Sequence, residues 1–164
     1  MKKFFKKIIG TVVEWALSYD REVLIQLDDT GRIPFKKEYS EGGQDAGVDL
    51  YVSEKTVIPA SGKVLVKTNI KVHTENKNIW FMLTGRSSTF HKLGLQLQTG
   101  IIDQPYQGYL FSSVFNTTDK EITLEVGDRV CQMIPFYNIP LKFTTVTEFK
   151  PTTRGHGGFG STGK

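Results

Sequence analysis

Short runs of alternating apolar and polar residues fill the chain from residue 22 onward and constrain its fold more than any other feature. They are rich in β-branched and aromatic residues, which favour strands. The runs read VLIQL, VDLYV, KVLVKTNIKV, IWFML, YLFSSVF, ITLEV and VCQMIPF. The separating segments DDTGRIP, PASG, TENKN, NTTDK and GD are typical of turns. With no second helical pattern, these runs predict an all-β sandwich, barrel or jelly roll.

The length and composition fit one ordered domain. At 164 residues with 38% hydrophobic content, the chain is long enough to bury a core. Its single cysteine, Cys131, excludes an intramolecular disulfide and a cysteine-based zinc cluster, and it is compatible with a reducing compartment. Because Cys131 stands in the apolar run RVCQMIPF, we expect its side chain to be buried.

Residues 1–21 follow a different pattern. Their apolar side chains recur at helix-face spacing, which predicts a basic amphipathic extension that packs on its own protein or on a partner. A helix on a membrane surface and a disordered segment stay open as alternatives. The stretch is too short and too charged at its start to span a membrane, and EWALSYDRE is a poor signal-peptide cleavage site.

The positive charge is concentrated in this extension. Of the net charge of +4, residues 1–21 carry +3, through Lys2, Lys3, Lys6, Lys7 and Arg21 against Glu14 and Asp20. The remaining chain is close to neutral, so we expect no broad basic face for nucleic acid.

The chain ends in a glycine-rich segment, residues 150–164, which has no periodicity and is predicted to be a mobile arm. Glycines let a backbone approach a polyphosphate closely, Arg154 can neutralise charge there, and Phe159 can stack on an aromatic base. The arm also carries the pair Ser161 and Thr162. A plain flexible linker is the alternative.

Two further segments place charged groups beside strands. DAGVDLYV puts Asp49 in an apolar strand opening, where a buried carboxylate needs a partner, and Arg129 of GDRV is the candidate for a salt bridge. TGRSST, residues 84–89, offers a cation and hydroxyls in a turn after the strand IWFML, which suits a phosphate group. A simple polar turn is the alternative.

TGIIDQPYQGYL, residues 99–110, is predicted to form a hairpin with Asp103 at its tip and Tyr106 three residues further on. A carboxylate beside a water can act as a general base, although an aspartate before a proline turn is often only a turn residue. Gln132 is either a ligand contact or a glutamine bonded to backbone. Without metal-ligand spacing among the histidines, a divalent ion would be held mainly by a ligand's phosphates. These histidines are His73, His91 and His156.

In this order, these segments resemble the five motifs of the trimeric dUTPase family. The likeness rests on AGVDL, GRSS, GIID..Y.G, GDR..Q and RG.GGFGSTG, and it covers residues 22–164. It implies a jelly-roll-like β subunit of the dUTPase β-clip type over residues 22–149, between the extension and the arm. It also implies a homotrimer that hydrolyses dUTP to dUMP and diphosphate with Mg²⁺, at active sites shared between subunits. Such an enzyme keeps uracil out of DNA, supplies dUMP for thymidylate synthesis, and is expected in the cytoplasm, or in the host cytoplasm if a phage encodes it.

The resemblance also implies roles for single residues. Asp103 would activate the attacking water, Tyr106 would pack under the deoxyribose, and the backbone of residues 98–102, with Gly100 and Ile102, would read the uracil edge. The phosphates would be held by Arg86, Ser87, Ser88 and Gln132. Asp49 would meet a magnesium-bound water, with no protein ligand directly on the metal. The arm would close over the γ-phosphate and the base through a catalytic Arg154 and through Gly157, Phe159, Gly160, Ser161 and Thr162.

The chain departs from the family pattern at Gln104 and Pro105, where many members carry a second acidic residue, so metal affinity or rate is expected to differ. The related dCTP deaminases place a catalytic glutamate five residues after the hairpin glycine. Ser113 stands at that position here and cannot shuttle the proton, which argues against deamination. A regulatory role through a partner protein stays open as an alternative, and the basic extension is the feature that favours it.

Overall fold

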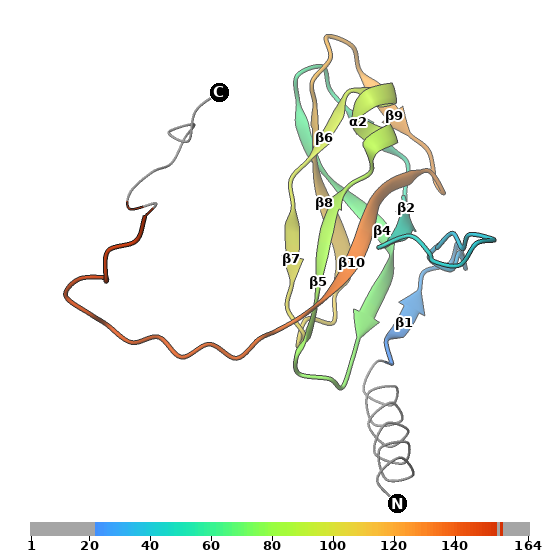
Figure 1. Ribbon diagram of the computed structural model, residues 1–164. Helices are drawn as coiled ribbons and strands as arrows, with labels where there is room; N and C mark the ends of the chain where they lie inside the picture. Colours follow the sequence, from blue (N-terminus) through green and yellow to red (C-terminus); the bar gives the residue numbers. More distant parts are fainter. Residues whose placement is uncertain (1–21, 154, 156–164) are drawn as a thin grey trace, which may run out of the picture.

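The alternating runs form two antiparallel sheets that enclose one apolar core (Figure 1). The computed structural model describes residues 22–153 and residue 155. The first sheet has the order β1-β4-β8-β6, with β1 (Leu24–Leu27), β4 (Lys63–His73), β8 (Tyr109–Asn116) and β6 (Leu95–Leu97). The second sheet has the order β2-β10-β5-β7, with β2 (Val48–Tyr51), β10 (Arg129–Tyr137), β5 (Ile79–Gly85) and β7 (Gly100–Ile102). A separate pair joins β3 (Thr56–Ile58) to β9 (Ile122–Leu124).

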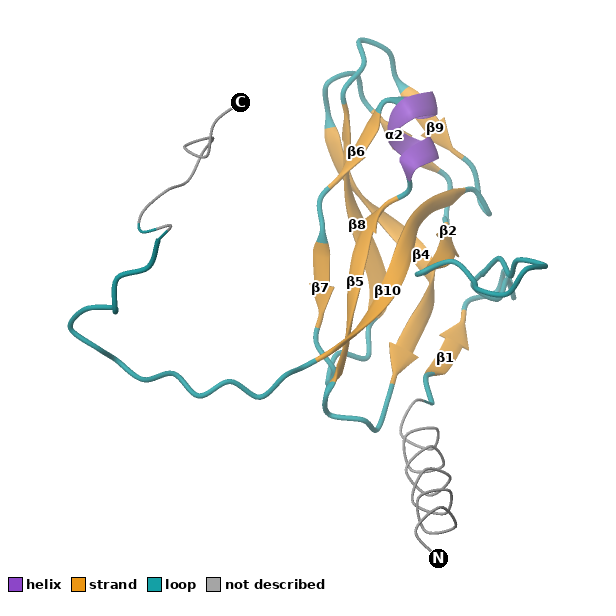
Figure 2. Ribbon diagram, viewed as in Figure 1, coloured by secondary structure: helices purple, strands orange, loops and turns teal. Residues whose placement is uncertain are grey.

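Every predicted run contributes a strand, so the expectation of a mostly β fold is confirmed (Figure 2). The period of two directs alternate side chains inward. In β8, for example, Leu110 and Val114 are fully buried, while Phe111 and Phe115 point outward and are exposed. Cys131 is buried in β10, as predicted, and this burial raises the pKa of its thiol to about 12.

One helix in the described residues was not predicted. TGRSST is not a turn after the strand, because Thr84 and Gly85 complete β5 and α2 (Ser87–Leu93) begins directly afterwards. A seven-residue helix spans only two turns, too few for helical periodicity to show in the sequence. Tertiary contacts fix it, because Thr89 is buried and its hydroxyl donates to the Val130 carbonyl at 3.2 Å. Gly94 ends the helix in the left-handed region, at φ 65°.

The predicted hairpin around Asp103 also differs from the structure. Its two arms belong to different sheets, since β7 pairs with β5 whereas β8 pairs with β4 and β6. The last contact of the incoming arm with β8 is the hydrogen bond from the Gln98 amide to the Ser113 carbonyl, at 2.9 Å. Gln98 and Thr99 belong to no strand, and this break lets the chain cross from the first sheet to the second. Asp103 is therefore on a crossover loop between sheets.

The two ends of the described chain lie beyond the sheets. The predicted extension of residues 1–21 lies outside the described residues, as does most of the predicted arm. After β10, residues 138–153 continue without regular structure and run away from the sheets (Figure 1). This segment exposes large apolar side chains, among them Ile139, Leu141 and Phe143. The described part of the chain contains no helix that is long and apolar enough to cross a membrane.

Candidate active site

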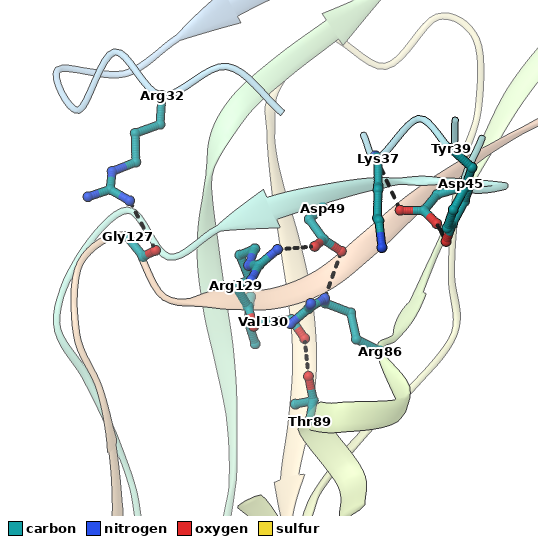
Figure 3. A network of polar contacts seen from close by, with 10 residues as sticks. All are labelled: Arg32, Lys37, Tyr39, Asp45, Asp49, Arg86, Thr89, Gly127, Arg129 and Val130. Carbon is teal, nitrogen blue, oxygen red and sulfur yellow. Dashed lines mark hydrogen bonds and ion pairs between the residues drawn. The ribbon is translucent and has the colours of Figure 1, made fainter. Parts of the chain in front are cut away.

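Three charged side chains meet where β5 passes into α2 (Figure 3). Asp49 of β2 accepts from Nε of Arg86 at 2.7 Å through one carboxylate oxygen, and from Nη1 of Arg129 at 3.1 Å through the other. The predicted salt bridge between Asp49 and Arg129 is therefore confirmed, and Arg86 is a second partner. Arg86 also donates from Nη1 to the Arg129 carbonyl at 3.3 Å. Because the guanidinium is held at two points, its remaining N–H groups have a fixed direction.

The predicted phosphate-binding residues surround this cluster. Gln132 lies between Asp49 and Thr84 in the strand register, and its amide donates to the Gly85 carbonyl at 3.1 Å. The interpretation of Gln132 as a glutamine bonded to backbone is thus confirmed, while its contact with a ligand stays a prediction. A cavity of about 420 Å³ opens beside Arg86 and Ser87, with Phe90 and Gln96 on its walls.

The hydroxyls of Ser87 and Ser88 make no hydrogen bond with the residues that the structure describes. Ser87 is exposed and Ser88 is half-buried, at the start of α2. Among the described residues, the Ser87 hydroxyl and the anchored Arg86 guanidinium are therefore available to an anion in this cavity, and Ser88 stands next to them.

Asp103 lies elsewhere, on the loop between β7 and β8. Its side chain is exposed, and within residues 22–153 its carboxylate has no hydrogen-bond or ion-pair partner. It lines a cavity of about 580 Å³ together with Lys77, Trp80, Ile101 and Asn138. A carboxylate open to solvent beside a cavity is available to bind a water and to accept a proton from it.

Tyr106 is fixed close to Asp103. Its amide donates to the Asp103 carbonyl at 3.0 Å, and its hydroxyl donates to the Tyr109 carbonyl at 2.8 Å. The ring lies against Gly108, where an added Cβ would stand 2.7 Å from Tyr106 Cζ. Only glycine leaves room for the ring there, so the Gly of the motif holds the tyrosine over the loop backbone.

Asp103 and Arg86 stand at opposite ends of the second sheet. Ile102 pairs with Phe81, which places Asp103 level with Trp80, whereas Arg86 follows the far end of the same strand. The positions of Trp80 and Arg86 are six residues apart along the strand, which corresponds to about 20 Å at a rise of roughly 3.3 Å per residue. The cavities beside Asp103 and Arg86 share no lining residue. One chain therefore does not bring its two groups of predicted site residues together.

The predicted uracil reader, the backbone at 98–102, lies on an open sheet edge. Gly100 and Ile102 belong to β7, whose side away from β5 has no strand partner among the described strands. The facing part of β8, residues 109–112, is likewise paired on one side only, with β4. Backbone N–H and C=O groups on both arms are thus available to a ligand between them.

The remaining predicted residues belong to the arm and lie outside the described residues. These are Arg154, Gly157, Phe159, Gly160, Ser161 and Thr162, and their roles stay predictions. Sequence reasoning missed Lys77 and Trp80 beside Asp103, and Phe35, whose ring lies 5.4 Å from the Arg129 guanidinium carbon. The half-buried Trp80, level with Asp103, could have been found only from the pairing of β5 with β7.

No group of three or more metal-ligating side chains occurs in the described part of the chain. Both carboxylate oxygens of Asp49 are already paired with arginines, so this side chain does not offer a ready metal ligand. A divalent ion that entered here would need most of its ligands from a bound nucleotide and from water.

An anchored arginine and the serine hydroxyls and carboxylate that have no partner in the described part of the chain are groups suited to an enzyme that acts on a phosphorylated substrate. The dUTPase family matches residues 35–163, which is most of the chain. The deoxyuridine 5'-triphosphate nucleotidohydrolase of Haemophilus ducreyi is 39% identical over 123 residues, which covers 73% of this chain and 81% of the relative. That of Paramecium bursaria Chlorella virus 1 is 36% identical over 124 residues, or 76% and 86% of the two chains.

A solved dUTPase has a similar fold. The dUTPase of Staphylococcus bacteriophage 80alpha with dUpNHpp superposes with a TM-score of 0.77 at 24% identity, over 88% of this chain and 99% of the phage chain. The chain belongs to the dUTPase family. It is a dUTP diphosphatase, an enzyme of nucleotide metabolism that hydrolyses dUTP, and the family resemblance of its motifs is confirmed.

Proposed function

We propose that the chain hydrolyses dUTP to dUMP and diphosphate through a water activated by Asp103, in an active site that a second copy of the chain completes. The observation that carries this proposal is the separation of about 20 Å between the free Asp103 carboxylate and the anchored Arg86. A general base and a phosphate-binding arginine must act on one substrate at the same time. If Asp103 and Arg86 act on the same substrate molecule, they therefore come from different copies of the chain.

Asp103 is the general base in this proposal. It would take the proton of a water that attacks the α-phosphorus. As the new bond to the water oxygen forms, the bond from the α-phosphorus to the leaving diphosphate would break on the opposite side. Its exposed carboxylate lacks any described partner, so no competing cation has to be displaced. A positioned base of this kind typically contributes about 10²–10⁴-fold to the rate.

The uracil and the sugar would bind beside this loop. The splayed arms β7 and β8 offer unpaired backbone groups, with Gly100 and Ile102 on one side, which suits the donor and acceptor pattern of the uracil edge. The ring of Tyr106, held against Gly108, would form the floor under the deoxyribose and leave no room for a 2′-hydroxyl.

The phosphates would bind at the other cluster, on the second copy. Arg86 and Ser87 line one cavity, Ser88 follows them in the chain, and Gln132 donates to the carbonyl of Gly85, which also lines it. Asp49 fixes the direction of the Arg86 guanidinium. Arg154 of the arm would stabilise the charge that builds on the phosphates, and Phe159 would cover the base. Gly157, Gly160, Ser161 and Thr162 would close over the nucleotide, and an arm that opens again lets product leave.

Members of this family use Mg²⁺ with the substrate, and the residues present fit an ion held mainly by the triphosphate. Such an ion neutralises charge on the phosphate oxygens. Asp49 would reach it only through a water, and only while giving up part of its pairing with Arg86 or Arg129. In our proposal, the main role of Asp49 is to pair with Arg86 and Arg129.

The copies would assemble through the outer face of the first sheet. On β4 and β8, Leu65 is 68% exposed, Phe111 45% and Phe115 42%, and Lys63 and Lys67 stand opposite the two phenylalanines. Large apolar side chains that are exposed on one face suit a protein interface. A closed homotrimer would bury three such faces and form three equivalent sites, each with the Asp103 loop of one copy opposite the Arg86 cluster of the next.

A regulatory role remains a second candidate. The phage 80alpha dUTPase is described as controlling the transfer of virulence genes, but at 24% identity the likeness supports the shared fold alone. The basic residues 1–21 are the segment of this chain that would contact such a partner.

The experiment for the main proposal is Asp103→Asn. The amide keeps the size of the side chain but cannot take a proton, so kcat for dUTP should fall by at least about 10²-fold. Binding of the non-hydrolysable analogue dUpNHpp, measured by calorimetry, should stay close to that of the wild type. Diphosphate release from dCTP, dTTP and UTP, measured alongside, defines the base and sugar selectivity. A variant that keeps more than about a tenth of the wild-type turnover would remove Asp103 from this role.

A further inference from the structure

Gln104 makes a shorter side-chain hydrogen bond to the rest of the fold than Gln107, the other residue of the Asp103 loop that reaches the β4 segment. Within the loop, Asp103, Pro105, Tyr106 and Gln107 are exposed, whereas Gln104 is half-buried and lines the same cavity as Asp103. Its side-chain amide Nε2 donates to the backbone carbonyl of Thr74, thirty residues away in the sequence, at 2.6 Å. This is a short hydrogen bond, and it joins the loop to the connection between β4 and β5.

The acceptor of this bond is rigidly held. Thr74 is only 1% exposed, and its hydroxyl donates to the Glu22 carbonyl at 2.9 Å. The Asn76 amide in turn donates to the Thr74 hydroxyl at 3.2 Å, and Asn76 Nδ2 donates to the Tyr137 hydroxyl at 2.7 Å. The Thr74 segment is thus braced to the start of β1 and to the end of β10. A group bonded to it acquires a fixed position.

The turn itself needs such support. The hydrogen bond from Tyr106 N to Asp103 O closes a four-residue turn with Gln104 second and Pro105 third. Proline at the third position disfavours the α conformation of the residue before it, so a common turn geometry is not available by default. The conformation of Gln104, and with it the direction of Asp103, therefore depends on contacts outside the turn.

We propose that Gln104 is a positioning residue for the general base: its hydrogen bond to the Thr74 carbonyl holds the Asp103 loop at the distance from the substrate that the reaction requires. Asp103 has no partner of its own among the described residues, so the backbone of its loop alone sets its place. This inference rests on the proposed role of Asp103.

The test removes the hydrogen-bond donor of Gln104 and keeps the length of its side chain. Gln104→Met has the same length and no N–H group, so it breaks the bond to Thr74 with little change in volume. We expect kcat for dUTP to fall about 10- to 100-fold, because a displacement of about 1 Å in a catalytic group costs a factor of this size. KM for dUTP and the Tm should stay near the wild-type values, and amide exchange in residues 103–108 should become faster.

Gln107→Met is the matched control on the same loop. The Gln107 side chain is exposed, and within residues 22–153 it reaches only the His73 ring, at 3.4 Å, so its loss should leave kcat and amide exchange in the loop unchanged. A wild-type kcat for Gln104→Met would overturn the inference, and so would an equal loss of kcat in both variants. If Gln104→Met fails to fold, Gln104→Asn, whose shorter amide does not reach Thr74, is measured in its place. Unfolding of both would overturn the inference, because Gln104 would then be a residue of general stability.

Asp103→Asn separates this inference from the proposed mechanism. If that variant retains wild-type turnover, the role of Asp103 fails and Gln104 has no base to position. If it is inactive and Gln104→Met is fully active, only the role of Gln104 fails.

Discussion

The two ends of the β5 strand carry groups of opposite character. At one end, Arg86, Asp49 and Arg129 pair with one another, and each side chain has its direction fixed by the others. At the other end, Asp103 has no side-chain partner in the described part of the chain, and only its backbone is held. The paired groups around Arg86 suit the binding of an anion. The Asp103 carboxylate suits a proton transfer, because the group that accepts the proton has to be accessible.

In our proposal, one chain holds two halves of a site. Neither half would do the chemistry alone, since phosphates held at Arg86 would lie about 20 Å from Asp103 along the strand. Assembly of copies would then be a condition of catalysis. Variants that act on assembly, on the Arg86 half and on the Asp103 half can separate these contributions.

The largest effect is expected from breaking assembly. Phe111→Glu places a charge in the exposed apolar face of β8, and burying that charge against another copy is strongly unfavourable. Sedimentation should show smaller species, and dUTP hydrolysis should fall by more than about 100-fold, because no complete site remains. Val57→Glu, an equally exposed position on β3 away from that face, is the control and should keep both properties. An active, dissociated Phe111→Glu protein would show that one chain suffices.

A smaller loss is expected from the Arg86 half. Arg86→Ala removes the anchored guanidinium while Asp49 keeps its bond to Arg129, so the fold should survive. We expect kcat/KM for dUTP to fall about 10²–10³-fold, as for other donors aimed at developing charge. Arg32→Ala, on the loop after β1, is the matched arginine control. Similar kinetics in the two variants would remove Arg86 from the phosphate site.

The smallest effect is expected at the sugar. In Gly108→Ala the new Cβ would stand 2.7 Å from Tyr106 Cζ, so the ring must move. We expect about a tenfold loss in kcat/KM for dUTP and a lower preference for dUTP over UTP. Tyr106→Phe keeps the ring against Gly108 and loses only the hydroxyl that donates to the Tyr109 carbonyl, so it should keep most of the preference. The ratio of kcat/KM values for the two nucleotides is the measurement, and an unchanged ratio in Gly108→Ala contradicts the sugar contact.

The sequence predicted those features that depend on local pattern. Alternation with period two identified the strands, and the cost of a buried carboxylate identified the pairing of Asp49 with Arg129. It missed α2, which is too short for a periodic signal and is fixed by the contact of Thr89 with Val130.

Long-range features of the site were also beyond the sequence. Asp103 lies level with Trp80 because β7 pairs with β5. This pairing depends on which strand edges meet in three dimensions. The same holds for the second partner of Asp49, Arg86, and for the bond from Gln104 to Thr74. The local sequence pattern determines which residues form a strand, whereas tertiary packing determines which residues that strand contacts.

The central claim is that Asp103 and Arg86 of one active site come from different copies, and complementation between two inactive proteins tests it most directly. Asp103→Asn and Arg86→Ala proteins are unfolded, mixed in equal amounts and refolded together. In a closed trimer every mixed assembly contains one site with both groups intact, so activity should recover to about a quarter of the wild-type value. Each variant refolded alone should stay inactive. If mass measurement confirms mixed trimers and the mixture remains as inactive as its parents, Asp103 and Arg86 act within one chain and the account is contradicted.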